Sequence, residues 1–554
     1  MDTRSPKFLF RVVLSLILGA GCVTSWTTVT SYSSARHALE DDASRPSAAE
    51  AARFLQQSTW GPTPDLISHV QDVGFQQFLE EQFAMPMSSY PTLALVPSTP
   101  PDSCPTGSVC RRDNYSLYPV QTRFFTNAFY ASDQLRQRVA FALHQILVVS
   151  GVDIGQGYPS RLTPYLQILN ADGFGNFRQL LYDITLNPAM GNYLDMANNT
   201  KTAPNENYAR EILQLFSIGL NQLNPDGSPM LDAQGRTIPT YDQSTVTAFA
   251  RVFTGWTFGP AQNGITNYID PMRVATASNH DTNPKTLLRG VTLPANQTAA
   301  KDLNDALDNI IQDPNVGPFI GRQLIQHLVT SNPSSAYIQR ITNVFNDNGS
   351  RVRGDLKAVV TAILLDPEAR ATPTSQSGHL MNPVLLITSL LRPFGPVSAG
   401  GTGQSDGYVD PQAVNMSMDV YSPPSVFSYY SPFGGAPGTS LRGPEFGLLN
   451  TSTAVRRTNF VNTLVFSRIA ANPNASPFNP SGTSLDFSGY QNLAGDPAAL
   501  VDALNTLMMS GQMSSDMRSA VITAVSAVAS SNPKRRVQTA VYLIATSSQY
   551  QVER

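Results

Sequence analysis

Apolar side chains recur every three or four residues along most of the chain from residue 47 onward, which is the period of an amphipathic helix. Ser47 and Glu50 form a capping box that begins the first helix, and Thr63-Pro64 begins the second. Gly74 separates the second helix from a third. The same spacing predicts further helices over residues 177–186, 205–218, 243–254, 299–312, 316–330, 336–346, 356–365, 383–391, 454–471, 498–507, 515–530 and 534–545.

One predicted helix differs from the others because it is apolar on nearly every side. It covers residues 139–149, and Ser132 stands where its N-terminal cap is expected. A helix without a polar face is unsuited to a surface, so this segment predicts a buried helix at the centre of the fold.

The remaining stretches lack helical periodicity. Residues 86–118 and 393–450 are rich in Pro, Gly or Ser and predict long irregular loops. The turn pairs Asp226-Gly227 and Gln234-Gly235 predict a small hairpin between two helices. The expected fold class is therefore mainly α: a large multi-helix domain with long irregular loops and a small β-hairpin insertion.

These patterns divide the chain into three folded parts. We expect a helical core domain over residues 47–395, an irregular segment over 396–450 and a C-terminal helical region over 451–554 that packs on the core. No repeat of fixed length appears, which argues against a solenoid. Only 14% of the 554 residues are charged and the net charge is −3, with no long basic run. The sequence therefore gives no indication of a nucleic-acid partner.

The N-terminus predicts the compartment. Arg4, Lys7 and Arg11 precede a short apolar core over residues 12–18, and Cys22 follows. This is typical of an export signal, here residues 1–22, which is too short to span a membrane as a mature helix. Cys22 stands where a bacterial lipoprotein is cut and lipidated, and cleavage by an ordinary signal peptidase is the alternative. We expect a protein of the periplasm or outer membrane, or an extracellular one, whose only membrane contact is a lipid anchor.

Two local features follow the export signal. Residues 23–46 are polar and rich in Ser and Thr, and they predict a flexible tether. Cys104 and Cys110 are the cysteines that remain once Cys22 is lipidated or removed, and they flank a turn-rich loop. In an oxidising compartment this spacing predicts a disulfide rather than a metal site.

The most unusual surface pattern lies in the predicted helix 205–218. Asn205 is placed to cap this helix. One arc of the helix carries the polar side chains of Glu206, Asn207, Arg210, Glu211 and Gln214. A solvated face with an ordinary pair between Glu206 and Arg210 is one interpretation. A functional surface is the other, because the arc holds two acids, an Arg and two amides but no Lys.

Three other positions are candidates for chemistry. His280 and Asp281 are adjacent in a loop, where they can act as a base with its orienting carboxylate or as two metal ligands. Adjacent side chains rarely face each other, which weighs against both roles. His144 lies in the buried helix, and we interpret it as a core histidine with a hydrogen-bond partner.

Further acidic side chains lie close to turns. Asp195, with Asn198 and Asn199, precedes the polar helix and is placed either to converge on its N-terminus, where free N–H groups attract anions, or to act as an ordinary cap. Asp226 and Asp232 of the hairpin have spacings that resemble a calcium loop, but the Glu that closes an EF-hand is absent. A plain hairpin is the alternative, and no cofactor is required.

Several segments together resemble one protein family. They are Pro204-Asn205-Glu206-Asn207-Tyr208-Ala209-Arg210-Glu211, Phe253-Thr254-Gly255-Trp256, His280-Asp281, Ala52-Arg53-Phe54-Leu55, Trp60-Gly61-Pro62-Thr63, Arg136-Gln137-Arg138-Val139-Ala140, Tyr193-Leu194-Asp195, Leu365-Asp366-Pro367-Glu368-Ala369-Arg370 and Pro424-Ser425-Val426-Phe427. This set resembles the bacterial domain-of-unknown-function 1800 family and covers nearly everything after residue 48. Family members often carry a second His two residues after His144, where this chain has Ile146, which argues against a paired-His metal site.

The resemblance also implies a setting. Members are often encoded beside a second family that resembles sulfatases and alkaline phosphatases, which implies a sulfatase-like envelope partner that handles an extracellular polymer. Two classes of function remain open. A binding or assembly accessory would use Asn205, Asn207, Arg210, Trp256, His144 and Asp195. An envelope hydrolase of glycans or esters would use Glu206, Glu211, His280 and Asp281. The absence of known catalytic motifs favours the accessory.

Overall fold

The computed structural model describes residues 45–155, 157–471 and 481–554. The predicted export signal with Cys22, and nearly all of the predicted tether, lie outside the described residues. From Pro46 to Arg554 the chain forms one compact unit. No helix among the described residues has the length and apolar character needed to cross a membrane.

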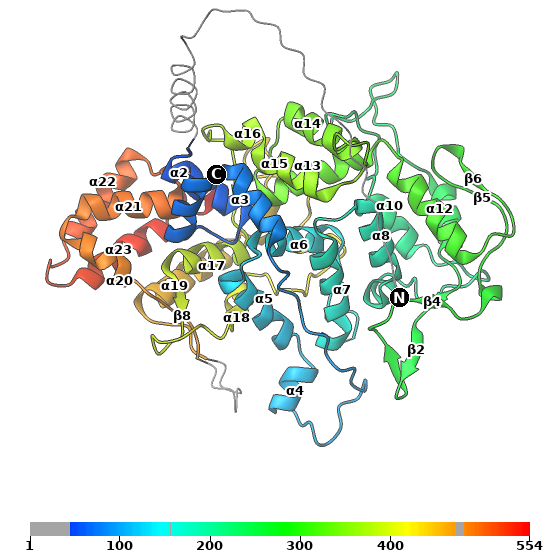
Figure 1. Ribbon diagram of the computed structural model, residues 1–554, viewed down its shortest axis with the longest axis horizontal. Helices are drawn as coiled ribbons and strands as arrows, with labels where there is room; N and C mark the ends of the chain where they lie inside the picture. Colours follow the sequence, from blue (N-terminus) through cyan, green and yellow to red (C-terminus); the bar gives the residue numbers. More distant parts are fainter. Residues whose placement is uncertain (1–44, 156, 472–480) are drawn as a thin grey trace, which may run out of the picture. The chain divides into compact units, whose positions relative to one another are not determined.

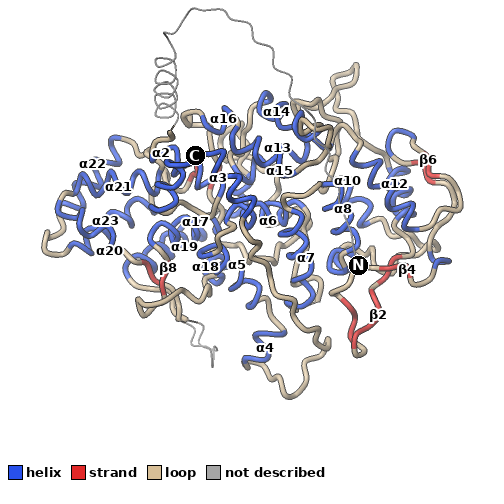
Figure 2. The backbone as a smooth tube through the Cα atoms, in the orientation of Figure 1, coloured by secondary structure: helices blue, strands red, loops and turns tan. Residues whose placement is uncertain are grey.

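The fold is mainly α, as the sequence predicts (Figure 2). The helices of the first half are α2 (Ala48–Ser58), α3 (Pro64–Ala84), α4 (Val109–Asn114), α5 (Tyr118–Tyr130), α6 (Gln134–Ile146), α7 (Pro159–Asp172), α8 (Phe177–Leu186), α9 (Pro188–Tyr193), α10 (Asn207–Gln214) and α11 (Gln243–Val252). Those of the second half are α12 (Ala299–Ile311), α13 (Val316–Leu328), α14 (Ser335–Asn346), α15 (Leu356–Leu365), α16 (Pro367–Arg370), α17 (Pro383–Leu391), α18 (Asp410–Asn415), α19 (Thr451–Phe466), α20 (Ser488–Gln491), α21 (Pro497–Met509), α22 (Ser515–Ser526) and α23 (Pro533–Ala545).

Short elements complete the described structure. The 3-10 helices are η1 (Ala277–Asn279), η2 (Leu288–Gly290), η3 (Arg392–Phe394), η4 (Pro444–Leu448) and η5 (Asn492–Gly495). The strands form antiparallel pairs: β1 (Trp256–Thr257) with β4 (Arg273–Val274), β2 (Gly259–Gln262) with β3 (Ile265–Asn267), β5 (Lys285–Thr286) with β6 (Thr292–Leu293), β7 (His379–Leu380) with β10 (Val552–Glu553), and β8 (Pro396–Val397) with β9 (Ser484–Leu485).

Local signals place several helix ends correctly. Ser47 and Glu50 form the predicted capping box of α2, and the Thr63 side chain caps α3. Gly74 has φ 79° and interrupts the helical backbone of α3, which confirms the predicted break. A left-handed φ is accessible to Gly because it lacks a Cβ atom.

The helix α6 occupies the predicted central position. All of its residues except Arg136 are buried, and it packs against α3, α5, α7 and α13 (Figure 1). Its ends differ from the prediction. Asp133 rather than Ser132 is the N-cap residue, and the helix stops at Ile146, so residues 147–149 are buried but not helical. The apolar residues 147–149 reflect burial rather than helical structure, so the sequence prediction placed the end of this helix too late.

Two core helices, α5 and α7, have no counterpart in the sequence prediction. In α7 the reason is Pro164, which lies inside the helix and is a residue that normally indicates a helix end. The segment 396–450 is mostly irregular, as predicted, yet it carries α18 and η4. Val409, Met416, Met418 and Val420 within it are fully buried. Its apolar side chains thus complete the core without regular structure.

The predicted hairpin insertion is present between α10 and α11. Gly227 and Gly235 have φ 75° and 77° at the two predicted turns, and backbone hydrogen bonds such as Gln222 N–H to the Ile238 carbonyl join the short extended segments. At the other end of the chain, α21, α22 and α23 pack together, and α21 packs on α2. The last strand, β10, pairs with β7 and brings residue 553 into the core.

The predicted disulfide is present. Cys104 and Cys110 are bonded, with their Cα atoms 5.3 Å apart. Cys104 is buried against Tyr115 and Tyr158 in a small cluster of its own. The bond therefore fixes the loop before α4 and leaves the main core untouched.

Candidate functional site

The polar arc lies on a shorter helix than predicted. Helix α10 begins at Asn207, with Glu206 at the N-cap position, and Asn205 does not cap it; the Asn205 Oδ1 accepts from the Asn207 N–H in a local turn. Glu206 accepts hydrogen bonds from Arg210 at 3.1 Å, from Gln243 at 2.7 Å and from Thr247 at 2.8 Å. Three side-chain donors thus hold one carboxylate in place at the surface between α10 and α11.

The two acids of the arc have opposite environments. Hydrogen bonds from Thr247 and Gln243 lower the pKa of Glu206. Glu211 is only 8% exposed, and its Oε2 has no hydrogen-bond partner among the described residues. Burial raises the pKa of Glu211, and the charge of Arg210 opposes that rise. Glu206 is therefore a fixed anion, whereas Glu211 is a carboxyl group that burial favours in its neutral form.

The loop before α10 adds to this surface. Asn207 donates to Asp195 at 3.3 Å, and the Asn205 N–H donates to the Asn199 Oδ1 at 2.8 Å. Asp195 and Asn198 have positive φ values of 57° and 67° and are exposed. Asp195 thus reaches the first turn of the helix through a side chain, in the manner of a local brace.

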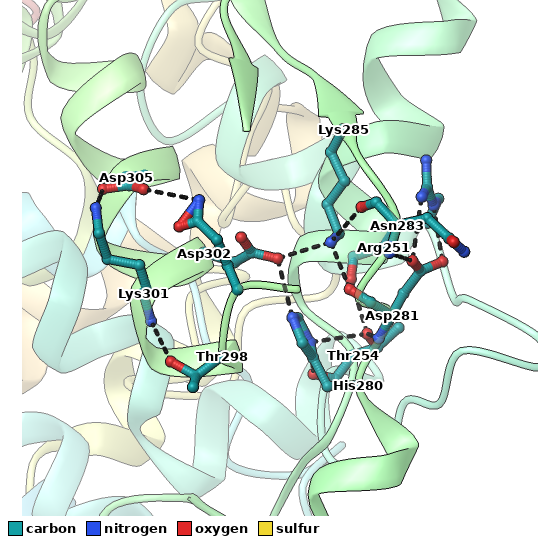
Figure 3. A network of polar contacts seen from close by, with 11 residues as sticks. Arg251, Thr254, His280, Asp281, Asn283, Lys285, Thr298, Lys301, Asp302 and Asp305 are labelled. Atoms are coloured by element: carbon teal, nitrogen blue, oxygen red, sulfur yellow. Dashed lines mark hydrogen bonds and ion pairs between the residues drawn. The ribbon is translucent and has the colours of Figure 1, made fainter. Parts of the chain in front are cut away.

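Asp281 lies in a separate group of buried charges (Figure 3). Its carboxylate accepts from Arg251 of α11 at 2.8 and 3.1 Å and from the Asn283 N–H at 2.8 Å. The hydrogen bond from Arg251 is the main reason that the pKa of Asp281 falls to about 2. With these donors in place, Asp281 is a fixed counter-charge for Arg251.

His280 belongs to the same group and faces two acceptors. Its Nδ1 lies 2.9 Å from the carbonyl oxygen of Thr254, and its Nε2 lies 2.9 Å from Oδ2 of Asp302. The Thr254 hydroxyl lies 3.2 Å from the same Nδ1, so both ring nitrogens have hydrogen-bond partners inside the fold. Lys285 donates to the same Asp302 oxygen at 2.7 Å (Figure 3). His280 is 2% exposed, so it links Thr254 to Asp302 inside the fold and presents neither ring nitrogen to solvent.

The two groups touch the same helix at different turns. Glu206 contacts Gln243 and Thr247, and Asp281 contacts Arg251, so the contacts follow one face of α11 at four-residue spacing. No hydrogen bond or ion pair in the described part of the chain joins Glu206 or Glu211 to His280 or Asp281. The structure thus places Glu206 in one network and His280 with Asp281 in another, while the Glu211 carboxylate makes no hydrogen bond to either group among the described residues.

The other candidates lie in the core or in turns. Trp256 is 5% exposed and its Nε1 has no partner among the described residues. His144 is buried against Tyr165 and Tyr421, and burial lowers its pKa to about 3. Its Nδ1 lies 3.1 Å from the Tyr165 hydroxyl, while its Nε2 has no partner in the described residues, so only one nitrogen is satisfied as predicted.

The hairpin acids form their own turns. Oδ1 of Asp226 accepts from the Ser228 N–H, and Asp232 accepts from the N–H groups of Gln234 and Arg236 and pairs with the Arg236 guanidinium. Within residues 45–155, 157–471 and 481–554, no group of three or more His, Cys, Asp or Glu side chains has the arrangement of a metal site.

Sequence reasoning missed another group of buried charges. Arg138 on α6 lies 3.8 Å from Glu553 on β10, and His379 on β7 lies 3.9 Å from Glu553 and 3.5 Å from Glu445 on η4. Burial raises the pKa of Glu553. Arg138 lies in a motif of the family resemblance. No residue near Glu553 in the sequence indicates its role, because its partner Arg138 lies far away along the chain.

Two cavities lie away from these charge networks. One, of about 500 Å³, lies between α7 and α8, and the other, of about 380 Å³, lies beside α16. Asp172 and Asp183 line the first, where burial and the charge of Asp183 raise the pKa of Asp172 to about 7.

Comparison with known proteins agrees with the family resemblance. The chain belongs to the family described as protein of unknown function (DUF1800), which it matches over residues 53–552. No curated protein and no solved structure gives a significant match. Family membership covers nearly the whole folded unit, and the activity has to be argued from the geometry.

Proposed function

We propose that this chain is an exported cell-envelope protein that binds an extracellular polymer, or helps to assemble it, together with a sulfatase-like partner. The contact surface is formed by α10, the loop before it and the start of α11. The main support for the proposal is that the fold leaves some candidate residues accessible and buries others. Glu206, Asn207 and Arg210 stay accessible at a surface, whereas His280 and Asp281 are held in buried ion pairs.

The accessible group has the chemistry of a recognition surface. Glu206 is fixed by three side-chain donors, so little side-chain freedom is lost when a ligand binds. Asp195, Asn205 and Gln243 are exposed beside it and supply further carboxylate and amide groups. Such groups accept and donate hydrogen bonds in the way that a hydroxyl-rich polymer requires. The N-terminal signal supports export, and the family resemblance supports the sulfatase-like partner.

Capture from native envelopes tests this proposal. The double variant Asn207→Ala/Gln243→Ala should melt like the wild type and retain less than about one tenth of the captured polymer and partner, since lost hydrogen bonds of about 1 kcal/mol each combine. The matched control is Gln339→Ala/Asn343→Ala, another exposed pair of amides, on α14. Equal capture by both double variants would remove the support for this surface.

One observation favours an envelope hydrolase as a second candidate. The opposite pKa shifts of Glu206 and Glu211 are those expected of an ionised base or nucleophile beside a protonated acid. In this case purified protein should release reducing ends from envelope glycans, or acid from their esters. Glu211→Gln should lower the rate by about a hundredfold or more and leave binding intact. No release by the wild-type protein would exclude this candidate.

A further inference from the structure

The cavity beside α16 has an unusual charge. It has a volume of about 380 Å³ and is formed where residues 371–378 pass α2 and the start of α14. Its wall carries the guanidinium groups of Arg53 and Arg554 together with the polar side chains of Gln57, Thr330, Asn332, Ser334, Thr372, Thr374, Gln376 and Ser377. We call it the anion cavity.

The arginines at this cavity form no ion pair in the described part of the chain. Arg53 is only 7% exposed, and its two Nη atoms donate to the backbone carbonyls of Ala371 and Ala369. Arg370 lies between the lining residues Ala369 and Ala371 in the sequence and donates to the lining residue Gln57. In the described part of the chain, neither of these guanidinium groups nor that of Arg554 forms an ion pair, and each has a buried Nε–H without an acceptor. Unpaired buried charge is costly, so a structure that keeps it has a reason to do so.

The nearest acids are already engaged. Glu368 lines the cavity, but its carboxylate accepts from the Ser334 N–H and hydroxyl. Glu50 is used by Ser47 in the capping box of α2. Burial, and then the charge of Arg53, lower the pKa of Arg370 to about 9. Both carboxylates keep their charge, so three guanidinium groups face two carboxylates at and near this wall, and positive charge is in excess there.

We propose that the anion cavity binds a sugar unit that carries a sulfate or phosphate ester. The ester oxygens would lie against Arg53 and Arg554, because guanidinium groups recognise oxyanions through paired N–H donors. The volume exceeds what an oxyanion alone would fill and lies in the range of small-molecule sites. The wall also carries Ser, Thr, Asn and Gln side chains, which supply hydrogen-bond donors and acceptors for the hydroxyl groups of the sugar. This site is independent of the α10 surface.

Calorimetry with defined sugars tests the assignment. Glucose 6-sulfate and glucose 6-phosphate should each bind the full chain at least about tenfold more tightly than glucose, and added NaCl should weaken both. The ester that binds more tightly shows whether the natural ligand carries a sulfate or a phosphate group. Equal binding of glucose, or equal binding of glucuronate, would overturn the assignment to a tetrahedral oxyanion, and no binding of either ester would overturn the site.

Two variants locate the binding. Arg554→Gln should weaken binding of the preferred ester by at least about tenfold without lowering the melting temperature, since this side chain is partly exposed and makes no ion pair with any described residue. Arg123→Gln, at an exposed arginine outside the cavity, is the matched control and should bind as the wild type does. Arg53→Gln is less decisive because Arg53 also holds two backbone carbonyls. Unchanged affinity in Arg554→Gln and Thr374→Ala together would place the ligand elsewhere and refute the proposal.

Discussion

Asp302 is the residue on which the buried charges around His280 depend. Its side chain is fully buried and faces both His280 and Lys285. Asp302→Asn removes the buried ion-pair partner of Lys285 and the carboxylate that faces His280, so we expect a loss of about 3–5 kcal/mol in the free energy of unfolding. Urea unfolding at pH 7 measures it.

The control for this prediction lies one turn away on the same helix. Asp305 pairs with Lys301, whose side chain is 61% exposed. Asp305→Asn should change the free energy of unfolding by less than about 0.5 kcal/mol, because exposed ion pairs contribute little. If both variants lose the same amount, burial is not what makes Asp302 important.

His144 makes a prediction about pH. Its pKa in the folded protein is about 3, below the usual value of about 6.5, so between these values the unfolded chain binds a proton that the folded protein does not. The stability that neutral His144 contributes is present above pH 6.5 and is lost as the pH falls toward 3. The difference in unfolding free energy between wild type and His144→Gln should therefore shrink by about 1 kcal/mol per pH unit below pH 6.5. A constant difference from pH 7 to pH 4 would contradict this.

At the scale of elements, α10 combines an exposed ion pair with a buried acid. Arg210→Ala should cost less than about 1 kcal/mol because both partners are partly exposed. Glu211 has a raised pKa, so the wild type loses stability as the pH rises through that pKa. Glu211→Gln should hence be at least as stable as the wild type at pH 8, and less favoured at pH 4. Melting curves of both variants at the two pH values measure this, and a large loss in Glu211→Gln at pH 8 would show that the carboxylate has a partner.

The loop and short helix around the disulfide form a second element with its own prediction. Removing the bond in Cys104→Ser/Cys110→Ser should cost about 2 kcal/mol, from loop-closure entropy in the unfolded chain. Faster hydrogen exchange should be confined to residues 86–118, since the bond packs in a cluster separate from the main core. Faster exchange in α6 would show that the loop supports the core as well.

For the whole folded unit, the contact of Arg138 with Glu553 ties the central helix to the last strand. Both side chains are nearly inaccessible. In Arg138→Met the Glu553 carboxylate stays buried beside His379 and loses its arginine partner. We therefore expect the free energy of unfolding to fall by about 3–5 kcal/mol. The double variant Arg138→Met/Glu553→Met should recover much of this loss, because no buried charge remains unpaired between them. A double-mutant cycle in urea measures the coupling.

Arg136 provides the matched control on the same helix. It is half-buried, and its guanidinium donates to the Asn170 carbonyl at 2.8 Å and forms no ion pair within the residues that the structure describes. Arg136→Met should lower the free energy of unfolding by less than Arg138→Met does. It should also show no coupling energy with Glu553→Met. Additive losses for Arg138 and Glu553 would mean that the two charges do not depend on each other.

The sequence by itself determined the features that rest on short-range physics. The capping box of Ser47 and Glu50, the break at Gly74, the burial of α6 and the disulfide at Cys104 involve residues only a few positions apart. Hydrogen bonds, backbone conformation and helical periodicity at that distance depend on neighbouring side chains, so the pattern of residues states them directly. The mainly α fold class follows from the same periodicity.

The tertiary structure alone decided which distant groups meet. Nothing near His280 in the sequence indicates Asp302, and nothing near Glu553 indicates Arg138. The pattern of the polar arc does not indicate that Glu206 is held at the surface while Glu211 is buried, with its Oε2 unpartnered among the described residues. The cations of the anion cavity come from α2, α16 and the last described residue. A local pattern fixes which side chains are charged, whereas the counter-charge, the burial and hence the pKa of each depend on packing between segments far apart in the chain.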